Sequence, residues 1–211
     1  MLCMIENRGI FMDIKEGNLI FSFSNEYTAI KFDDTGFYRN RFSKSPDSKG
    51  VDIIADSKDV IQIIEIKNCV GFERDNLWRT ATNNRLKDKE ELKHVNLHKD
   101  SLDIEVSKKL LDTIACLVGA WTKKEQSENA NELTEYFKGI TDINVCNFKK
   151  QIWVILFLEG DFSALVRTRS KKMIMNELQK SMKDKLQWLN CKVVVMDSET
   201  YNNKLFEVSK I

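Results

Sequence analysis

Residues 51–68 read VDIIADSKDVIQIIEIKN, and this stretch decides the fold. Two runs rich in Ile and Val, at 51–56 and 60–68, are separated only by the polar residues 57–59. β-Branched side chains favour strands, and a short polar connection between two strands is typical of a β-hairpin. The stretch therefore predicts two antiparallel strands joined by a tight turn.

Charged side chains interrupt one face of this apolar hairpin. Side chains alternate between the two faces of a strand, so Glu65 and Lys67 share one face of the second strand. Asp52 and Glu65 stand at nearly matched distances from the turn, and in an antiparallel pair such residues lie across from each other. We therefore expect Asp52, Glu65 and Lys67 to meet at one end of the sheet.

This trio suggests a chemistry. Two neighbouring carboxylates are unfavourable unless a proton or a cation lies between them. Mg²⁺ and Mn²⁺ prefer oxygen ligands, and proteins hold Mg²⁺ with one or two carboxylates plus substrate phosphate. A nearby lysine can orient a water or stabilise negative charge in the transition state. The simpler alternative is a surface ion pair between Glu65 and Lys67, worth about 0–1 kcal/mol.

The flanking sequence predicts a mixed α/β fold. Residues 151–158 are almost wholly apolar, as in a strand covered on both faces, and 104–124 has apolar residues at helical spacing. Further strands are expected at 10–14, 18–23, 37–42 and 191–196, and further helices at 25–32, 133–137 and 167–189. This order predicts a central mixed sheet flanked by helices. We expect one domain over residues 1–211, with an N-terminal hairpin extension (1–23), a charged insertion (69–103) and a C-terminal helix-strand extension.

The D-x(12)-E-x-K arrangement on a hairpin, followed by a helix and a strand, resembles the PD-(D/E)XK nuclease superfamily. The resemblance covers residues 24–160 and implies a restriction-endonuclease-like core. It implies that Asp52 and Glu65 bind a metal and that Lys67 is the catalytic lysine. Many members add a glutamate from the helix before the first core strand, and Glu26 stands at the matching place.

The same resemblance implies Mg²⁺- or Mn²⁺-dependent hydrolysis of phosphodiester bonds, with DNA the expected substrate and a homodimer the expected assembly. Val51 stands where many members have proline before the aspartate. A literal Pro46-Asp47 lies upstream in a turn-like segment, so we assign the metal to Asp52 rather than Asp47. The alternative function is a non-catalytic nuclease-like module that binds nucleic acid or a protein partner.

Charge patterning bears on the expected nucleic-acid contact. The chain has 33 Lys and Arg against 32 Asp and Glu, a net charge of +1, which excludes a strongly basic nucleic-acid-binding protein. Segment 149–192 nevertheless has ten basic and four acidic residues. Four of the basic residues gather where the helix dipole disfavours cations, at the start of the last long helix: Arg167, Arg169, Lys171 and Lys172. We expect them to contact phosphate, the alternative being a solvated helix face.

Cysteine usage and the N-terminus bear on location. The five cysteines are odd in number and contain no CxxC, as for free thiols in a reducing cytoplasm. No apolar run approaches the ~18–20 residues of a membrane span, and the first ten residues lack a signal-peptide core. We therefore expect a cytoplasmic protein. His94 and His98 have the spacing of a zinc-binding pair, but their charged surroundings, without further ligands nearby, favour a solvated segment.

Overall fold

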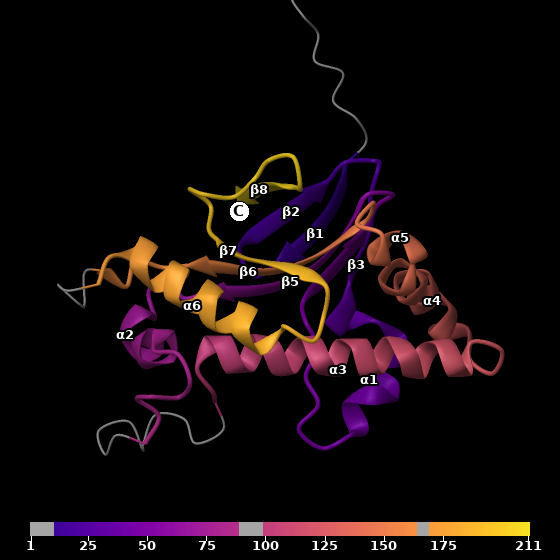
Figure 1. Ribbon diagram of the computed structural model, residues 1–211, viewed down its shortest axis with the longest axis horizontal. Coiled ribbons are helices and arrows are strands. Elements are labelled where there is room, and N and C mark those ends of the chain that lie inside the picture. The colour runs from indigo at the N-terminus through magenta and orange to yellow at the C-terminus, as the bar shows by residue number, and fades with distance from the viewer. Residues whose placement is uncertain (1–10, 89–98, 164–168) are drawn as a thin grey trace, which may run out of the picture.

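The computed structural model describes residues 11–88, 99–163 and 169–211. Its centre is a five-stranded sheet with the strand order β3-β4-β5-β6-β7 (Figure 1). β3, β4 and β5 pair antiparallel to one another, and β6 and β7 are added parallel to β5. The strand bounds are β3 (Thr28–Lys31), β4 (Ile53–Asp56), β5 (Val60–Asn68), β6 (Gln151–Glu159) and β7 (Cys191–Met196).

Helices cover one face of this sheet. The longest, α3, runs horizontally below the sheet in Figure 1, and α4 and α6 pack against it. The helix bounds are α1 (Gly36–Asn40), α2 (Glu73–Asn76), α3 (Leu102–Lys123), α4 (Glu128–Thr141), α5 (Ile143–Cys146) and α6 (Lys171–Lys185). Short 3₁₀ helices span Phe32–Asp34, Phe42–Lys44 and Leu77–Thr80.

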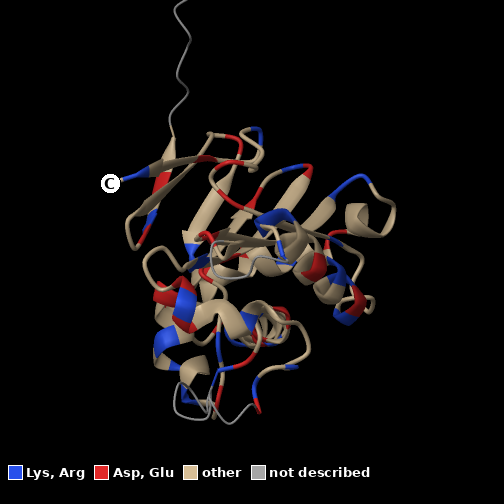
Figure 2. Cartoon of the chain, turned by 90° about the vertical axis from the view of Figure 1, so that its left-hand side faces the viewer, with Lys and Arg blue, Asp and Glu red and all other residues tan. Residues whose placement is uncertain are grey.

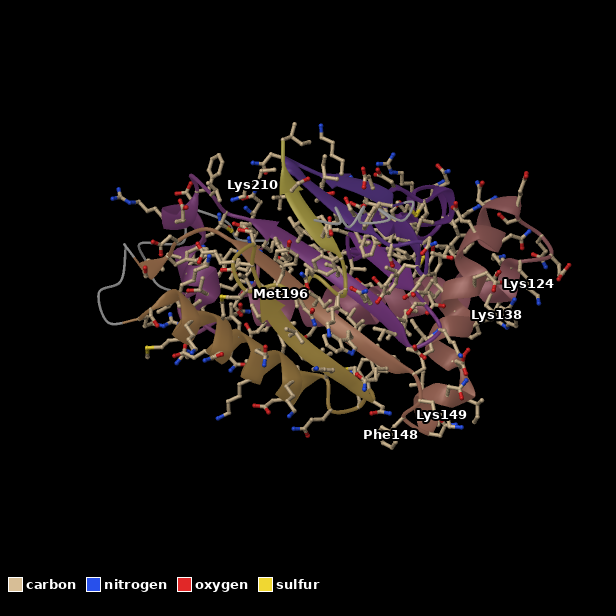
Figure 3. The ribbon with its side chains drawn as sticks, turned by 90° about the horizontal axis from the view of Figure 1, so that it is seen from above. Lys124, Lys138, Phe148, Lys149, Met196 and Lys210 are labelled. Carbon is tan, nitrogen blue, oxygen red and sulfur yellow. The ribbon has the colours of Figure 1, made fainter. Side chains whose placement is uncertain are left out.

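A second sheet covers the opposite face. It has the order β1-β2-β8, formed by β1 (Met12–Glu16), β2 (Leu19–Phe23) and β8 (Glu207–Lys210). Seen from above, β8 crosses over the five-stranded sheet (Figure 3). The central strands are therefore buried on both sides, by a helix-side core and a core between the two sheets. Side-chain alternation along a strand decides which core each residue enters. In β5, Ile61 and Ile63 join the helix-side core, while Ile64 and Ile66 join the core between the two sheets.

The predicted α/β class, a central mixed sheet flanked by helices, is confirmed. The N-terminal hairpin forms as β1 and β2, and the hairpin of residues 51–68 forms as β4 and β5. The strands expected near 151–158 and 191–196 are β6 and β7. The helices expected near 104–124 and 133–137 are α3 and α4, and α6 falls within the predicted 167–189 helix.

Two local predictions are wrong. Residues 25–32, expected as a helix, form a turn followed by β3, because Thr28–Lys31 pair with β4 along their whole length. Residues 37–42, expected as a strand, belong largely to α1 and the 3₁₀ helix after it. In both places a weak local pattern gives way to tertiary packing: Phe32 and Phe37 are buried in the helix-side core.

The described part of the 69–103 segment packs against the fold. Trp78, Arg79 and Thr80 are buried in its 3₁₀ helix, and Asp103 is fully buried at the start of α3. Residues 89–98, which include His94 and His98, lie outside the described residues. Within the described ranges, no helix combines the length and apolar character that a membrane crossing requires.

Candidate active site

Asp52 and Glu65 stand opposite each other across the β4–β5 hairpin. The register ends with Ile53 paired to Ile64, and just beyond it the Asp52 N–H donates to the Ile64 carbonyl at 3.1 Å, which brings Asp52 to the Glu65 position of β5. Both side chains point to the helix-covered face, and both are buried. The backbone fixes Asp52 further, since the Ile66 N–H donates to Asp52 Oδ2 at 2.6 Å. Asp52 Oδ1 is thereby the oxygen left to face Glu65.

A lysine from α3 lies between the two carboxylates. Lys109 Nζ is 2.7 and 2.8 Å from the two Glu65 oxygens and 3.7 Å from Asp52 Oδ1. Two neighbouring carboxylates are unfavourable unless a proton or a cation lies between them. In this structure that cation is the Lys109 ammonium.

Lys67 reaches the same place from the end of β5. Its Nζ lies 2.7 Å from Glu65 Oε1 and 2.8 Å from Glu105 Oε1. The other Glu105 oxygen, Oε2, accepts from Arg79 Nη2 at 2.6 Å. These contacts form a chain of alternating charge, which we call the site network. Its members, in order, are Asp52, Lys109, Glu65, Lys67, Glu105 and Arg79.

The site network is assembled by the position of α3 over the sheet. Glu105 and Lys109 are one helical turn apart and share the buried side of α3 with Val106 and Leu110. Thr113, one turn further along the same side, accepts a hydrogen bond from the Val51 N–H at 3.1 Å. This contact fastens α3 directly beside Asp52.

Burial sets the protonation of Asp52. Desolvation, with the neighbouring Glu65 carboxylate, raises the pKa of Asp52 to about 6. Lys109, the Ile66 N–H and Lys67 oppose this increase only in part. The charged form of Asp52 is therefore destabilised by its surroundings, and carboxylates with a perturbed pKa of this kind are frequent at functional sites.

Lys67 is held in its charged form. Burial alone would lower its pKa, but the carboxylates of Glu65 and Glu105 more than compensate, so the pKa of Lys67 is raised well above the ordinary value for lysine. In turn, although burial would raise it, Lys67 and Arg79 hold the pKa of Glu105 below its usual range. In this arrangement the Lys67 ammonium is suited to donate hydrogen bonds and stabilise negative charge, and not to accept a proton.

A cavity of about 460 Å³ opens beside Glu105. It is called here the Glu105 cleft, and it lies between the segment 42–49 and the first half of α3. Its lining residues are Phe42, Ser45, Pro46, Asp47, Ser48, Lys49, Lys87, Asp100, Glu105, Lys108, Leu111 and Asp112. Glu105 is the member of the site network that lines the cleft, so a ligand in the cleft would lie next to Glu105, the partner of Lys67.

Two sequence assignments can be compared directly with this geometry. Asp47, with φ of 58° in its turn, lines the Glu105 cleft, while Asp52 faces Glu65, as the sequence argument expected. Glu26, expected as a metal ligand, lies at the opposite end of the sheet: Thr28 pairs with Asp56, whereas the site is at the Lys31–Ile53 end. Its expected helix is absent, and its side chain is exposed.

Of the four basic residues expected to contact phosphate, two form ion pairs within the fold. Arg169 bonds Glu177 Oε2 at 2.5 Å, and Lys171 pairs with the buried Asp197. Lys172 is exposed on α6, and Arg167 lies outside the described residues. Two of the four side chains therefore already have carboxylate partners in the fold.

Three members of the site network were not identified from the sequence: Glu105, Lys109 and Arg79. The signal for Lys109 was its position on the buried side of α3, one turn after Glu105 and beside Leu110. A buried lysine is rare unless it is paired, so this placement predicts an acidic partner. Arg79 had no comparable signal, because its short helix has no sustained apolar pattern.

Asp52 and Glu65 supply two carboxylates at one position, and carboxylate oxygens are ligands of the kind that Mg²⁺ and Mn²⁺ prefer. Asp52 Oδ1 and both Glu65 oxygens converge on one cation position, and Mg²⁺ sites commonly use one or two carboxylates with water and phosphate. Across residues 11–88, 99–163 and 169–211, no group of three or more His, Cys, Asp or Glu side chains is arranged to hold a metal. Within the described ranges the candidate donor set is thus these two carboxylates.

A family model described as a family of unknown function (DUF6661) matches residues 35–210. The chain belongs to the DUF6661 family. The DUF6661 match contains every member of the site network and leaves out β1, β2, β3 and Glu26. No curated protein and no solved structure matches the sequence.

Proposed function

We propose that this protein hydrolyses phosphodiester bonds with a bound Mg²⁺ or Mn²⁺ ion, through a site of the PD-(D/E)XK kind. The observation that supports this most is the meeting of Asp52, Glu65 and Lys67 on one face of the hairpin, with both carboxylates directed at a single cation. DNA is the proposed substrate, making the protein a restriction-endonuclease-like nuclease.

The proposed chemistry assigns a task to each residue. Asp52 and Glu65 would hold the ion, which when bound acts as a Lewis acid and lowers the pKa of water. The Lys67 ammonium would lie beside the phosphate. There it would stabilise the negative charge that develops on the phosphate oxygens as water attacks phosphorus and the P–O bond to the leaving group breaks. Glu105 would position Lys67 through the 2.8 Å contact.

The proposal also covers how the substrate reaches the site, where the protein works and whether it forms a dimer. The Glu105 cleft would admit the phosphodiester, with Lys49 and Lys108 among its lining residues. The described cysteines 69, 116, 146 and 191 are all free, as suits a reducing cytoplasm. A homodimer would bring two sites to the two strands of a duplex.

The test is cleavage of plasmid and of single-stranded DNA by the full chain with Mg²⁺ or Mn²⁺. We expect Lys67→Met to lose about 10²–10³-fold in rate, the usual effect of losing one charge-stabilising donor. Lys67→Arg should retain more activity, because it keeps the charge that the proposal assigns to this position. Glu65→Gln should lose metal-dependent cutting, and Lys138→Met, at an exposed position on α4, should not. Robust cutting by Lys67→Ala and Glu65→Ala would refute the proposal.

A second function has its own support: a non-catalytic nuclease-like module that binds nucleic acid or a protein partner. The site network contains three acids and three bases, so it balances its own charge. Isothermal titration with Mg²⁺ up to millimolar concentration, with and without DNA, separates the two functions. DNA binding without metal binding or cleavage would favour the module.

A further inference from the structure

Lys109 occupies the position that the proposed function gives to the metal. Its ammonium is the one cation among the described residues that contacts Asp52 and Glu65 together. The ammonium lies at hydrogen-bond distance from both Glu65 oxygens, and Mg²⁺ needs its oxygen ligands at ~2.0–2.1 Å. A divalent cation between Asp52 Oδ1 and Glu65 would occupy the space of this ammonium and repel its charge, so lysine and metal exclude each other at this position.

The surroundings offer Lys109 a second partner. Glu105 precedes it by one helical turn on the same side of α3, the spacing at which a glutamate and a lysine form a pair. Glu105 also lines the cleft. A lysine that leaves Glu65 can therefore turn toward Glu105 without leaving the buried side of its helix, and its ammonium then lies closer to the cleft.

We propose that Lys109 is a built-in counter-ion that closes the site in the metal-free protein, and that a divalent cation binds by displacing its ammonium toward Glu105 and the cleft. This inference rests on the proposed function and adds a competitor within the chain. It explains how two buried carboxylates coexist without metal. It also gives metal binding a cost, the separation of Lys109 from Glu65.

The test is Mn²⁺ binding to the full-length protein, by isothermal titration and by thermal shift, with Lys109→Met as the variant. Without metal, Lys109→Met should melt at a lower temperature than the wild type, because two buried carboxylates lose their cation. With Mn²⁺ it should bind about ten-fold more tightly, the factor that ~1.4 kcal/mol gives, and show the larger rise in melting temperature. Lys123→Met, exposed in the last turn of α3, is the matched control and should behave as the wild type.

A second variant keeps the test decisive if Lys109→Met does not fold. Lys109→Arg preserves the cation and can bond a carboxylate through two N–H groups, so it should fold and bind Mn²⁺ more weakly than the wild type. Mn²⁺ binding by Lys109→Met that is equal to or weaker than wild-type binding would overturn the inference and leave the proposed function intact. Equal or tighter binding by Lys109→Arg would do the same. Absence of Mn²⁺ binding in the wild type and in every variant would overturn both.

Discussion

Asp52 destabilises the metal-free fold at neutral pH. Its pKa rises from 3.8 to about 6 on folding, so the folded state binds this proton more tightly than the unfolded state. Its contribution to the free energy of unfolding therefore falls as the pH rises from about 4 to about 6, and stays low above that. Asp52→Asn removes the charge and keeps an oxygen for the Ile66 N–H.

We expect Asp52→Asn to raise the free energy of unfolding above pH 6 by on the order of 1–3 kcal/mol, since one pKa unit is worth about 1.4 kcal/mol. The gain should disappear toward pH 4, where the wild-type carboxyl is already protonated in both states. Urea denaturation at several pH values in the presence of a chelator measures it. A variant less stable than the wild type at pH 8 would contradict this account of Asp52.

The meeting of the hairpin trio could be predicted from sequence, whereas for its neighbours the sequence indicated at most that Lys109 needs an acidic partner, without showing which one. Asp52, Glu65 and Lys67 follow from strand alternation and a short turn, which are local rules. Glu105 and Lys109 come from a helix some forty residues further along the chain, and only the packing of that helix brings them to the sheet. The prediction for Glu26 was wrong because it relied on a local helix pattern, and strand pairing of the following residues with β4 replaces that helix.

The same contrast holds for whole elements. Strands β5 and β6 are buried on both faces along most of their length, and their runs rich in apolar residues identified them directly. The four-residue strand β8 was not predicted, because its sequence EVSK has no strand pattern, and its pairing partner β2 lies near the other end of the chain. Short edge strands of this kind depend on tertiary contacts more than on propensity.

Two helical glycines should respond to alanine in opposite ways. A Cβ at Gly119 in α3 would lie 3.8 Å from the Phe37 ring, an ordinary contact. A Cβ at Gly139 in α4 would lie 2.6 Å from Asp56 Oδ2, and Asp56 is fixed by a 2.6 Å pair with the buried Lys150. Helix propensity is therefore the deciding effect at Gly119, and overlap is the deciding effect at Gly139.

Gly119→Ala should stabilise the protein by roughly 0.5–1 kcal/mol, the usual gain from alanine in a helix interior. Gly139→Ala should destabilise it by about 1–3 kcal/mol, because the close contact forces side chains to shift. Chemical denaturation of the two variants side by side measures both. A stabilised Gly139→Ala would mean that α4 packs less closely on β4 than the structure indicates.

At the scale of the molecule, charge is spread while apolar packing is concentrated. In the view of Figure 2, basic and acidic residues are interspersed over helices, strands and loops. The core between the two sheets instead gathers rings around Phe206, whose centroid lies 5.4 Å from that of Phe21 and 5.8 Å from that of Phe23. This cluster fastens the second sheet to the first.

Phe206→Ala should lower the free energy of unfolding by about 3–5 kcal/mol, the range for a buried phenylalanine. Phe148→Ala is the matched control, since Phe148 is 75% exposed and lies at the margin of the molecule (Figure 3). Its effect should stay within about 0.5 kcal/mol. Urea unfolding curves of the two variants make the comparison, and equal losses would show that Phe206 is not an anchor.

The pairing of β2 with β8 has a consequence for the order of folding. It joins Leu19 to Lys210, so the ladder can close only after nearly the whole intervening chain has been organised. A strand of four residues forms too few hydrogen bonds to drive that closure by itself. The pairing of β8 therefore depends on the aromatic rings around Phe206 that pack next to it. In hydrogen exchange, the amides of β8 should therefore be the first of the sheet to open and those of β5 among the last. Each opening would briefly expose an apolar sheet surface, the moment at which the protein is most prone to associate with another copy.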